Sequence, residues 1–299
     1  MPFRPVPELK AMLEPTMNAL QDTMEGDIVR WILGFSLAAI VAFAGFRSRS
    51  LSLPGALAAI AAGGLIVGAG GWWTGLLLVA FFVSSATLSH ARPKANATAG
   101  EVRQARGHRR EAVQVLANGG VPVICALVGS ARTDPAPWFV AAAAAIAGAT
   151  ADTWATEIGR GSTSAPRSII TGKALPPGTS GAISAIGTLG SAAGAVVIAG
   201  LAALGAATNV WIAAPALGVF FTVAVAGVAG SLLDSVLGAT VQGIWWCSAC
   251  DQETELASHH CGSRVDLVRG FAFMDNDRVN AISIAGAGGA GLSMTSLIF

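Results

Sequence analysis

Apolar stretches of roughly 17 to 25 residues recur along this chain, and that length crosses the hydrocarbon core of a membrane as an α-helix. Among its 299 residues, 53% are hydrophobic and only 12% are charged, with a mean hydropathy of +0.62. Soluble domains normally contain about 25% charged residues, and a water-soluble core could not bury so much apolar surface. The chain is therefore predicted to be an all-α, multi-pass transmembrane helix bundle.

Eight membrane spans are predicted from the apolar runs. They cover 30–46, 51–70, 72–88, 113–130, 138–158, 181–204, 208–230 and 279–298. The segment 231–246 contains Asp234 and Gln242 directly after an apolar run, and we expect it to form a tilted or re-entrant helix. Residues 1–29 are predicted to form an amphipathic or surface helix before a single transmembrane domain, 30–299. This helix is expected to be retained, because it lacks the basic and apolar regions of a signal peptide.

The basic residues are distributed unevenly between the two sides of this topology. If the loop 89–112 is cytoplasmic, fourteen of the eighteen Lys and Arg residues lie on that side. The positive-inside rule then places three loops in the cytoplasm, 89–112, 159–180 and 247–278. A ninth span through 231–246 would move the last loop outside and remove this asymmetry. The formal net charge is only +1, so the overall charge implies no particular partner. The apolar spans make the membrane an expected partner, and no nucleic acid is expected.

One basic face leads from the first of these loops into the membrane. Arg103, Arg106, Arg110, Gln114 and Asn118 form a stripe on one side of a helix,. Such a stripe favours an anionic ligand, although a basic segment that attracts anionic lipids would look similar. The glycines and proline of 119–122 could break the helix and open a polar cavity, or they could produce an ordinary kink.

Acidic side chains inside the predicted spans indicate a functional site. Asp152 and Glu157 are five residues apart, about 140° around a helix, so they cannot face one ligand unless the helix unwinds or Glu157 lies past its end. Asp234 shares a narrow helical arc with Gln242 and several small or polar residues. Acids in a membrane are normally paired, hydrated or bound to a cation. Acids with nearby Arg and Lys suit a Mg²⁺–triphosphate, whereas simple interhelical ion pairs are the alternative.

Two loop segments offer further groups for the same polar site. The loop 171–181 contains glycines, Lys173, Thr179 and Ser180 before a helix, and free N–H groups at a helix start favour anions. Its residue order excludes a Walker A loop, and a plain turn with an N-cap is the alternative. The segment 275–280 provides Asn276, Asp277, Arg278 and Asn280, although a solvated loop beside a helix would have a similar composition.

Three of the four cysteines lie close together in the sequence. Cys247, Cys250, His260 and Cys261 are predicted to bind a structural Zn²⁺, with His259 able to replace His260,. Four protein ligands leave no open position, which argues against a catalytic zinc. Redox or unligated thiols are the alternative, and Cys125 is expected to be a packing residue in an apolar span.

Taken together, five of these motifs resemble an integral membrane family of the transmembrane-protein-19 type, which includes phytyl-phosphate kinase of plants and cyanobacteria. The matching motifs span about residues 85–299 in the family's order: 114–120, 151–159, 178–181, 234–242 and 276–280. The resemblance implies transfer of a phosphoryl group from a nucleoside triphosphate to phytyl or a related isoprenyl monophosphate. The diphosphate product would serve tocopherol and related prenyl-lipid synthesis.

The resemblance also implies roles for individual residues. Asp152 and Asp234 would hold Mg²⁺, with Glu157 and Asp277 as further catalytic candidates. Nucleotide or phosphate binding would involve Arg103, Arg106, Arg110, Asn118, Lys173, Thr179, Ser180, Gln242, Asn276, Arg278 and Asn280. CTP is the favoured nucleotide, because the pattern from Asp152 to Gly159 and the later Lys173 resembles CTP-dependent phytol and dolichol kinases.

Two other functions remain open at the level of the sequence. A transporter or flippase of phosphorylated lipids would use the same arginines without chemistry, but it has less need for clustered acids. A CTP-dependent nucleotidyl transferase would release pyrophosphate instead of a nucleoside diphosphate. Identification of the products formed from a prenyl phosphate and a nucleotide would separate all three.

Overall fold

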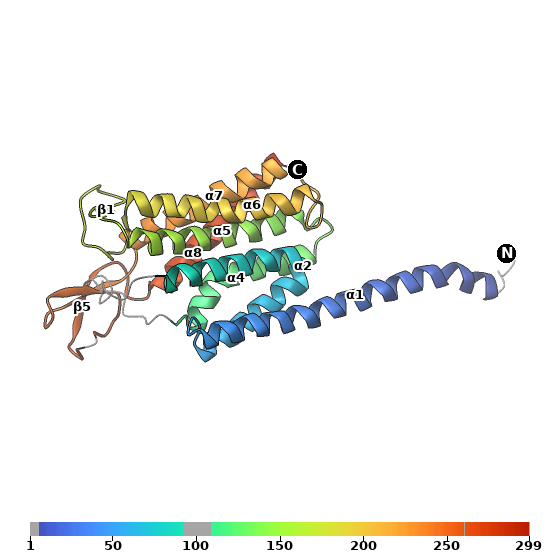
Figure 1. Cartoon of the computed structure of the whole chain (residues 1–299), viewed down its shortest axis with the longest axis horizontal. Coiled ribbons are helices and arrows are strands. Elements are labelled where there is room, and N and C mark those ends of the chain that lie inside the picture. Colours follow the sequence, from blue (N-terminus) through green and yellow to red (C-terminus); the bar gives the residue numbers. More distant parts are fainter. Residues whose placement is uncertain (1–5, 92–108, 260, 299) are drawn as a thin grey trace.

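The computed structural model describes residues 6–91, 109–259 and 261–298, with side chains from residue 26 onward. These residues form a helix bundle with two small β-sheets (Figure 1). The bundle consists of α1 (Val6–Arg47), α2 (Leu53–His90), α4 (Ala112–Ser130), α5 (Ala136–Gly159), α6 (Ala185–Ala207), α7 (Ala216–Thr240) and α8 (Asn276–Met294). A short 3-10 helix, η1 (Thr295–Leu297), follows α8.

Helix α2 reverses direction at Gly71, where φ is 78° and ψ is 175°. Residues with a side chain rarely adopt this backbone conformation, which explains the glycine. Phe82 in the second arm packs against Leu51 and Ala56 at the start of the first. The two arms therefore run antiparallel, and they occupy the predicted segments 51–70 and 72–88.

Five helices among the described residues are long and apolar enough to cross a membrane, compared with the eight spans predicted. They are Gly26–Arg47, α2, α4, α6 and α7. Helix α2 counts once in this set although it has two arms. Helices α5 and α8 are not among the five, because they are rich in small and polar residues. In α5, every residue from Val140 to Ala151 is buried by neighbouring helices. Few of its side chains would therefore contact lipid, so large apolar residues are not needed there.

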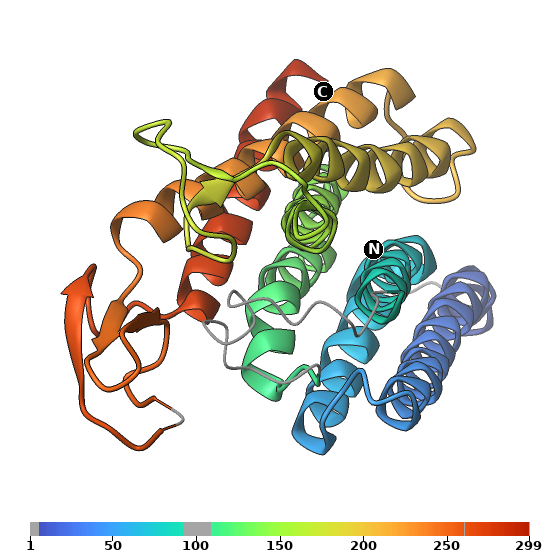
Figure 2. The ribbon, with the colours of Figure 1, turned by 60° about the vertical axis from the view of Figure 1, so that its left-hand side comes forward.

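Helix α5 occupies the centre of the bundle and packs against α2, α4, α6, α7 and α8. Figure 2 shows α1 at the edge of the bundle, beside the arms of α2. Small residues allow the central helices to approach closely. At Gly227 in α7, an added Cβ would lie 2.8 Å from the Cβ of Ala147 in α5. The close contact between α5 and α7 determines how near their acidic side chains lie.

The separate helix predicted for 231–246 does not occur. Helix α7 continues to Thr240, and a strand begins at Ile244. Ser283 and Asn280 of α8 donate hydrogen bonds to the Asp234 carboxylate, so this acid does not interrupt the helix. The predicted span 208–230 also begins too early, because Asn209 has a φ of 54° and Pro215 immediately precedes α7. Nor does the proline motif break α4, which runs through Pro122 without interruption.

The prediction of an all-α fold requires correction at the loops. Strands β1 (Arg167–Ser168) and β2 (Ala182–Ile183) pair antiparallel. A second antiparallel sheet has the order β4-β3-β5, formed by β3 (Ile244–Cys247), β4 (Gln252–Thr254) and β5 (Val265–Arg269). Aromatic and β-branched residues favour these strands. Both sheets lie at one end of the bundle, where α1 ends (Figure 1).

Candidate functional site

The candidate site is centred on two acids from adjacent helices. Asp152 belongs to the last part of α5, and Asp234 belongs to the last part of α7. Both side chains are partly buried. They lie close enough for the negative charges of Asp152 and Asp234 to repel each other. Two carboxylates placed together in a protein interior repel each other, so this arrangement suits a bound cation.

Helix α8 fixes the Asp234 carboxylate through a single oxygen. Ser283 donates a hydrogen bond from Oγ to Oδ2 of Asp234 over 3.0 Å. Asn280, with its amide nitrogen oriented toward the acceptors, donates to the same Oδ2 at 2.9 Å and to the carbonyl of Asn276 at 3.2 Å. Three helices, α5, α7 and α8, thus meet at the acid pair.

The loop 178–181 packs directly on the end of α7. At Gly181, where φ is 81°, an added Cβ would lie 2.4 Å from the Cβ of Ala239. Ser180 donates a hydrogen bond to Oε1 of Gln242 over 2.7 Å. The Gln242 side chain is buried, and its Nε2 has no partner among the described residues. A buried amide donor of this kind is suited to a ligand oxygen.

Arg269 joins this loop to α7 and was absent from the predicted site. Its guanidinium donates to the carbonyls of Ser180, at 3.3 Å, and Gly238, at 3.2 Å. The Arg269 Nε is buried without a partner in the described part of the chain. No pattern in the sequence indicated this role, because Arg269 meets the Ser180 and Gly238 carbonyls only when β5 packs beside the end of α7.

Glu157 lies in a second cluster, as the angle around α5 predicted. Ser89 in the second arm of α2 donates to Oε1 of Glu157 over 2.9 Å, and Arg160 lies 3.5 Å from the same oxygen. The negative charge of Glu157 also attracts the Arg110 guanidinium. This guanidinium lies 5.5 Å from the ring centroid of Phe81. Because α5 remains helical to Gly159, Glu157 and Asp152 face different neighbours.

An apolar cavity of about 320 Å³ lies beside this second cluster, between α1, α2 and α4. Its polar lining consists of Arg110, Gln114 and Asn118. Gln114 accepts from the backbone N–H of Glu111, and Asn118 donates to the Gln114 carbonyl. The remaining walls are apolar or glycine, with Leu37, Val41, Leu76, Val79, Phe82 and Val115 among them.

Several predicted residues lie apart from the acid pair or have local partners. Lys173 is exposed beside the β1–β2 sheet, and Thr179 donates to the Pro176 carbonyl. Arg278 is exposed, and it contacts Asp275 and the Phe273 carbonyl. Asp277 is buried at the start of α8. Arg103, Arg106 and His260 lie outside the described residues.

Two serines that contact the acids were also missed. Ser283 follows Asn280 by three residues, so both lie on one face of α8, and a helical projection could have found it. Ser89 reaches Glu157 only because the second arm of α2 packs against α5. No local pattern in the sequence could have indicated that contact.

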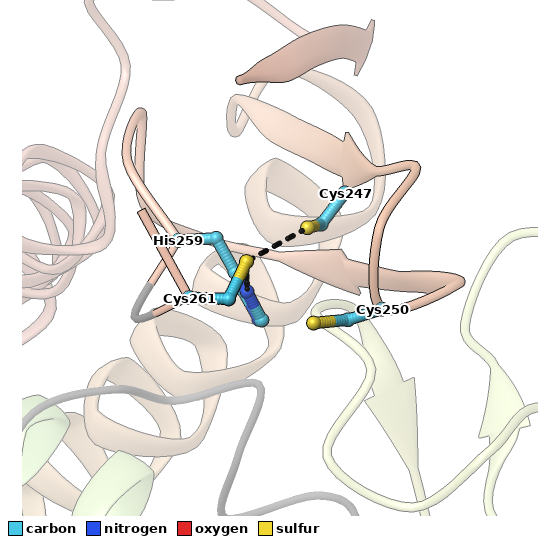
Figure 3. Close-up of side chains that lie close together, drawn as sticks. All are labelled: Cys247, Cys250, His259 and Cys261. Carbon is cyan, nitrogen blue, oxygen red and sulfur yellow. Dashed lines mark hydrogen bonds between the residues drawn. The ribbon is translucent and has the colours of Figure 1, made fainter. Parts of the chain in front are cut away.

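The cysteine-rich segment forms a distinct cluster on the β3–β4–β5 sheet. Figure 3 shows the side chains of Cys247, Cys250, His259 and Cys261 converging on one point. All three thiols are free. Hydrogen bonds with Ser263 and then His259 lower the pKa of the Cys261 thiol to about 5. The histidine in this cluster is the one predicted as the alternative to His260.

Comparison with known proteins supports the family resemblance. Residues 36–288 match the family described as integral membrane protein DUF92. The chain is 32% identical to "Protein PGR" of Arabidopsis thaliana over 274 residues, covering 85% of this chain and 92% of that protein. It is 28% identical to an uncharacterized membrane protein of Methanocaldococcus jannaschii over 218 residues, covering 73% and 85%, respectively. No solved structure matches the chain.

Proposed function

This chain belongs to the DUF92 family of integral membrane proteins, and we propose that it is a prenyl-phosphate kinase. It would transfer a phosphoryl group from a nucleoside triphosphate, with CTP favoured, to phytyl or a related isoprenyl monophosphate. The observation that carries this proposal is the pair of neighbouring acids, Asp152 and Asp234, at one end of the bundle. Beside them lies the loop 178–181, which contains glycines and hydroxyl side chains. We place this end at the cytoplasmic face, where nucleotides are available.

The acid pair fits a magnesium ion, because Mg²⁺ is commonly bound by one or two carboxylates together with phosphate oxygens. Asp234 is held through Oδ2 by Ser283 and Asn280, so its second oxygen would serve as the ligand, together with Asp152. A bound Mg²⁺ would neutralise charge on the triphosphate. The buried Nε2 of Gln242 and the serine loop would bind phosphate oxygens on the same side.

The proposed reaction needs little proton transfer. An oxygen of the lipid monophosphate would form a bond to the γ-phosphorus, and the bond from that phosphorus to the β–γ bridging oxygen would break. The products are the lipid diphosphate and a nucleoside diphosphate, which keeps the bridging oxygen. Because the acceptor oxygen is already anionic, positioning and charge neutralisation supply most of the rate acceleration.

The cavity between α1, α2 and α4 supports a lipid acceptor. Its walls are apolar, while Arg110 lies at its polar side next to Glu157. A hydrocarbon tail would fill the cavity, and Arg110 would pair with the lipid phosphate, as arginine does with phosphates elsewhere. Glu157 would then orient Arg110, which gives this acid a positioning role away from the metal.

We expect Ala59→Phe to lower kcat/KM for phytyl phosphate by about tenfold or more, because Ala59 lines the cavity. Each methylene of the lipid tail that the phenyl ring displaces from the cavity costs about 0.8 kcal/mol of binding free energy. About 1.4 kcal/mol corresponds to a factor of ten, so displacement of about two methylenes gives the expected loss. Dimethylallyl phosphate, which has a short tail, should be affected much less. Leu57→Phe on the exposed side of the same helix is the matched control. Equal losses for both substrates with Ala59→Phe would argue against a tail in this cavity.

The activity itself is tested with purified protein in detergent, Mg²⁺, phytyl or geranylgeranyl monophosphate, and CTP, GTP, ATP or UTP in turn. Mass spectrometry should detect the lipid diphosphate together with a nucleoside diphosphate. Pyrophosphate and a nucleotidyl lipid would identify a nucleotidyl transferase instead. If no pair is converted, while vesicles containing the protein move the lipid phosphate across the bilayer, the transporter is the correct function.

A further inference from the structure

We infer that Cys247, Cys250, His259 and Cys261 bind one structural zinc ion that joins the turn after β3 to the segment after β4. Their four ligand atoms all lie within 4.8 Å of one another. Cys247 and Cys261 have their sulfurs 3.5 Å apart, and Nδ1 of His259 lies 3.1 Å from the Cys261 sulfur. In a tetrahedral zinc site, ligand atoms are separated by about 3.5 to 3.8 Å, given Zn–S and Zn–N distances of about 2.3 and 2.0 Å.

The backbone brings these ligands together from two turns. Cys247 ends β3, and the N–H of Cys250 donates to its carbonyl over 3.3 Å. The second turn closes where the N–H of Gly262 donates to the His259 carbonyl over 2.9 Å, with a φ of 75° at Gly262. Two short turns facing each other across a small sheet are a common arrangement for a structural zinc.

The surroundings of His259 fit a metal ligand. Its second ring nitrogen, Nε2, lies 3.0 Å from the side-chain amide of Gln252 in β4. A histidine that binds metal through Nδ1 carries its proton on Nε2 and donates it to a neighbouring acceptor. In the structure the amide nitrogen Nε2 of Gln252 faces this ring nitrogen. A half-turn of the amide would present its oxygen, which would accept the proton of a zinc-bound His259. His259 itself is buried, which fixes the ring.

The number and type of ligands favour a structural ion over other roles. Three thiols and an imidazole complete a tetrahedral set, so no position remains for substrate or water. A disulfide would use only two of the three thiols and would leave His259 without a role. A loop placed in the cytoplasm also makes a disulfide unfavourable.

The position of the cluster connects it to the candidate site. Strand β3 carries Cys247 and begins directly after Gly243, and Gln242 before it lies just beyond the end of α7. Strand β5 pairs with β3, and its Arg269 holds the Ser180 and Gly238 carbonyls. A zinc ion that fixes this sheet would therefore also fix Arg269 and the end of α7.

The metal content of the full-length protein tests this inference independently of any activity. Wild-type protein purified in detergent without added metal should contain about one zinc per chain. Cys250→Ser and Cys261→Ser should lose it, whereas Cys125→Ser in α4 should retain it. His259→Ala should lose the zinc and His260→Ala should keep it. Loss with His260→Ala and retention with His259→Ala would overturn the assigned ligand set.

A second measurement applies if the cysteine variants do not fold. A chelator added to the wild-type protein should release the zinc and make three more thiols reactive toward a thiol reagent. Replacement by Co²⁺ should give the visible absorption of a tetrahedral thiolate site. Wild-type protein without a transition metal, or with a disulfide among the three cysteines, would overturn the inference.

Discussion

Asp152→Asn and Asp234→Asn should each lower the rate of phosphoryl transfer by about a hundredfold or more. Each substitution keeps the shape of the side chain and removes one of the two charges proposed to hold Mg²⁺. Loss of a single group that stabilises transition-state charge costs about 10² to 10³ in kcat. In Asp234→Asn, the new amide oxygen can still accept from Ser283 and Asn280, so the local hydrogen bonds should survive. Initial rates at several Mg²⁺ concentrations measure the effect.

Stability separates this loss from misfolding. Without Mg²⁺, two neighbouring carboxylates repel each other, so either of these variants should melt at the same temperature as the wild type or higher. Asp266→Asn is the matched control, because Asp266 is exposed on β5 at the same end of the bundle. Its rate should remain within about twofold, as expected for an exposed side chain away from the site. Full activity in both Asp152→Asn and Asp234→Asn would refute a metal site at the acid pair.

Gly181→Ala should reduce both stability and activity far more than Gly172→Ala. Both glycines have a positive φ, 81° and 68°, so each alanine incurs a backbone cost of about 1 to 2 kcal/mol. An added Cβ at Gly172 meets nothing within 4 Å, whereas at Gly181 it would lie 2.4 to 2.5 Å from atoms of Ala239. Overpacking adds about 1 to 3 kcal/mol, and the displaced loop would lose the bond from Ser180 to Gln242.

Thermal unfolding in detergent, together with the transfer rate, measures this difference. Gly172→Ala should show a modest decrease in melting temperature and retain its activity. Gly181→Ala should melt at a clearly lower temperature, and its activity should fall because the loop no longer rests on α7. If the two variants behave alike, the contact between this loop and Ala239 does not organise the site.

Much of the helical arrangement was predictable, because apolar runs bounded by polar residues define helices well. The predicted span 138–158 is α5, Ala136–Gly159, and 113–130 is α4, Ala112–Ser130. The prediction failed where a polar side chain has a tertiary partner. Asp234 suggested an interruption of the helix, but Ser283 and Asn280 bind its carboxylate, so α7 passes through.

The candidate site also divides into features that follow from local sequence patterns and features that depend on tertiary contacts. The 140° between Asp152 and Glu157 is a local property of α5, about 100° per residue over five residues, and it correctly indicated that the two acids face different groups. Helical projection on α7 grouped Gln242 with Asp234, yet Gln242 lies beyond the end of the helix and binds Ser180. Arg269 and Ser89 reach the site only through contacts between distant elements. Such contacts depend on how strands and helices pack, and the spacing of residues along the sequence does not specify this packing.

The most direct test of the proposed kinase follows the γ-phosphate itself. CTP labelled with ¹⁸O in its γ-phosphate is incubated with phytyl phosphate, Mg²⁺ and purified protein, and the lipid and nucleotide products are analysed by mass spectrometry. A phytyl diphosphate that carries the label in its terminal phosphate, in amounts equal to the CDP formed, is the predicted result. An unlabelled lipid, or labelled pyrophosphate released with a cytidylyl lipid, would contradict phosphoryl transfer at this site.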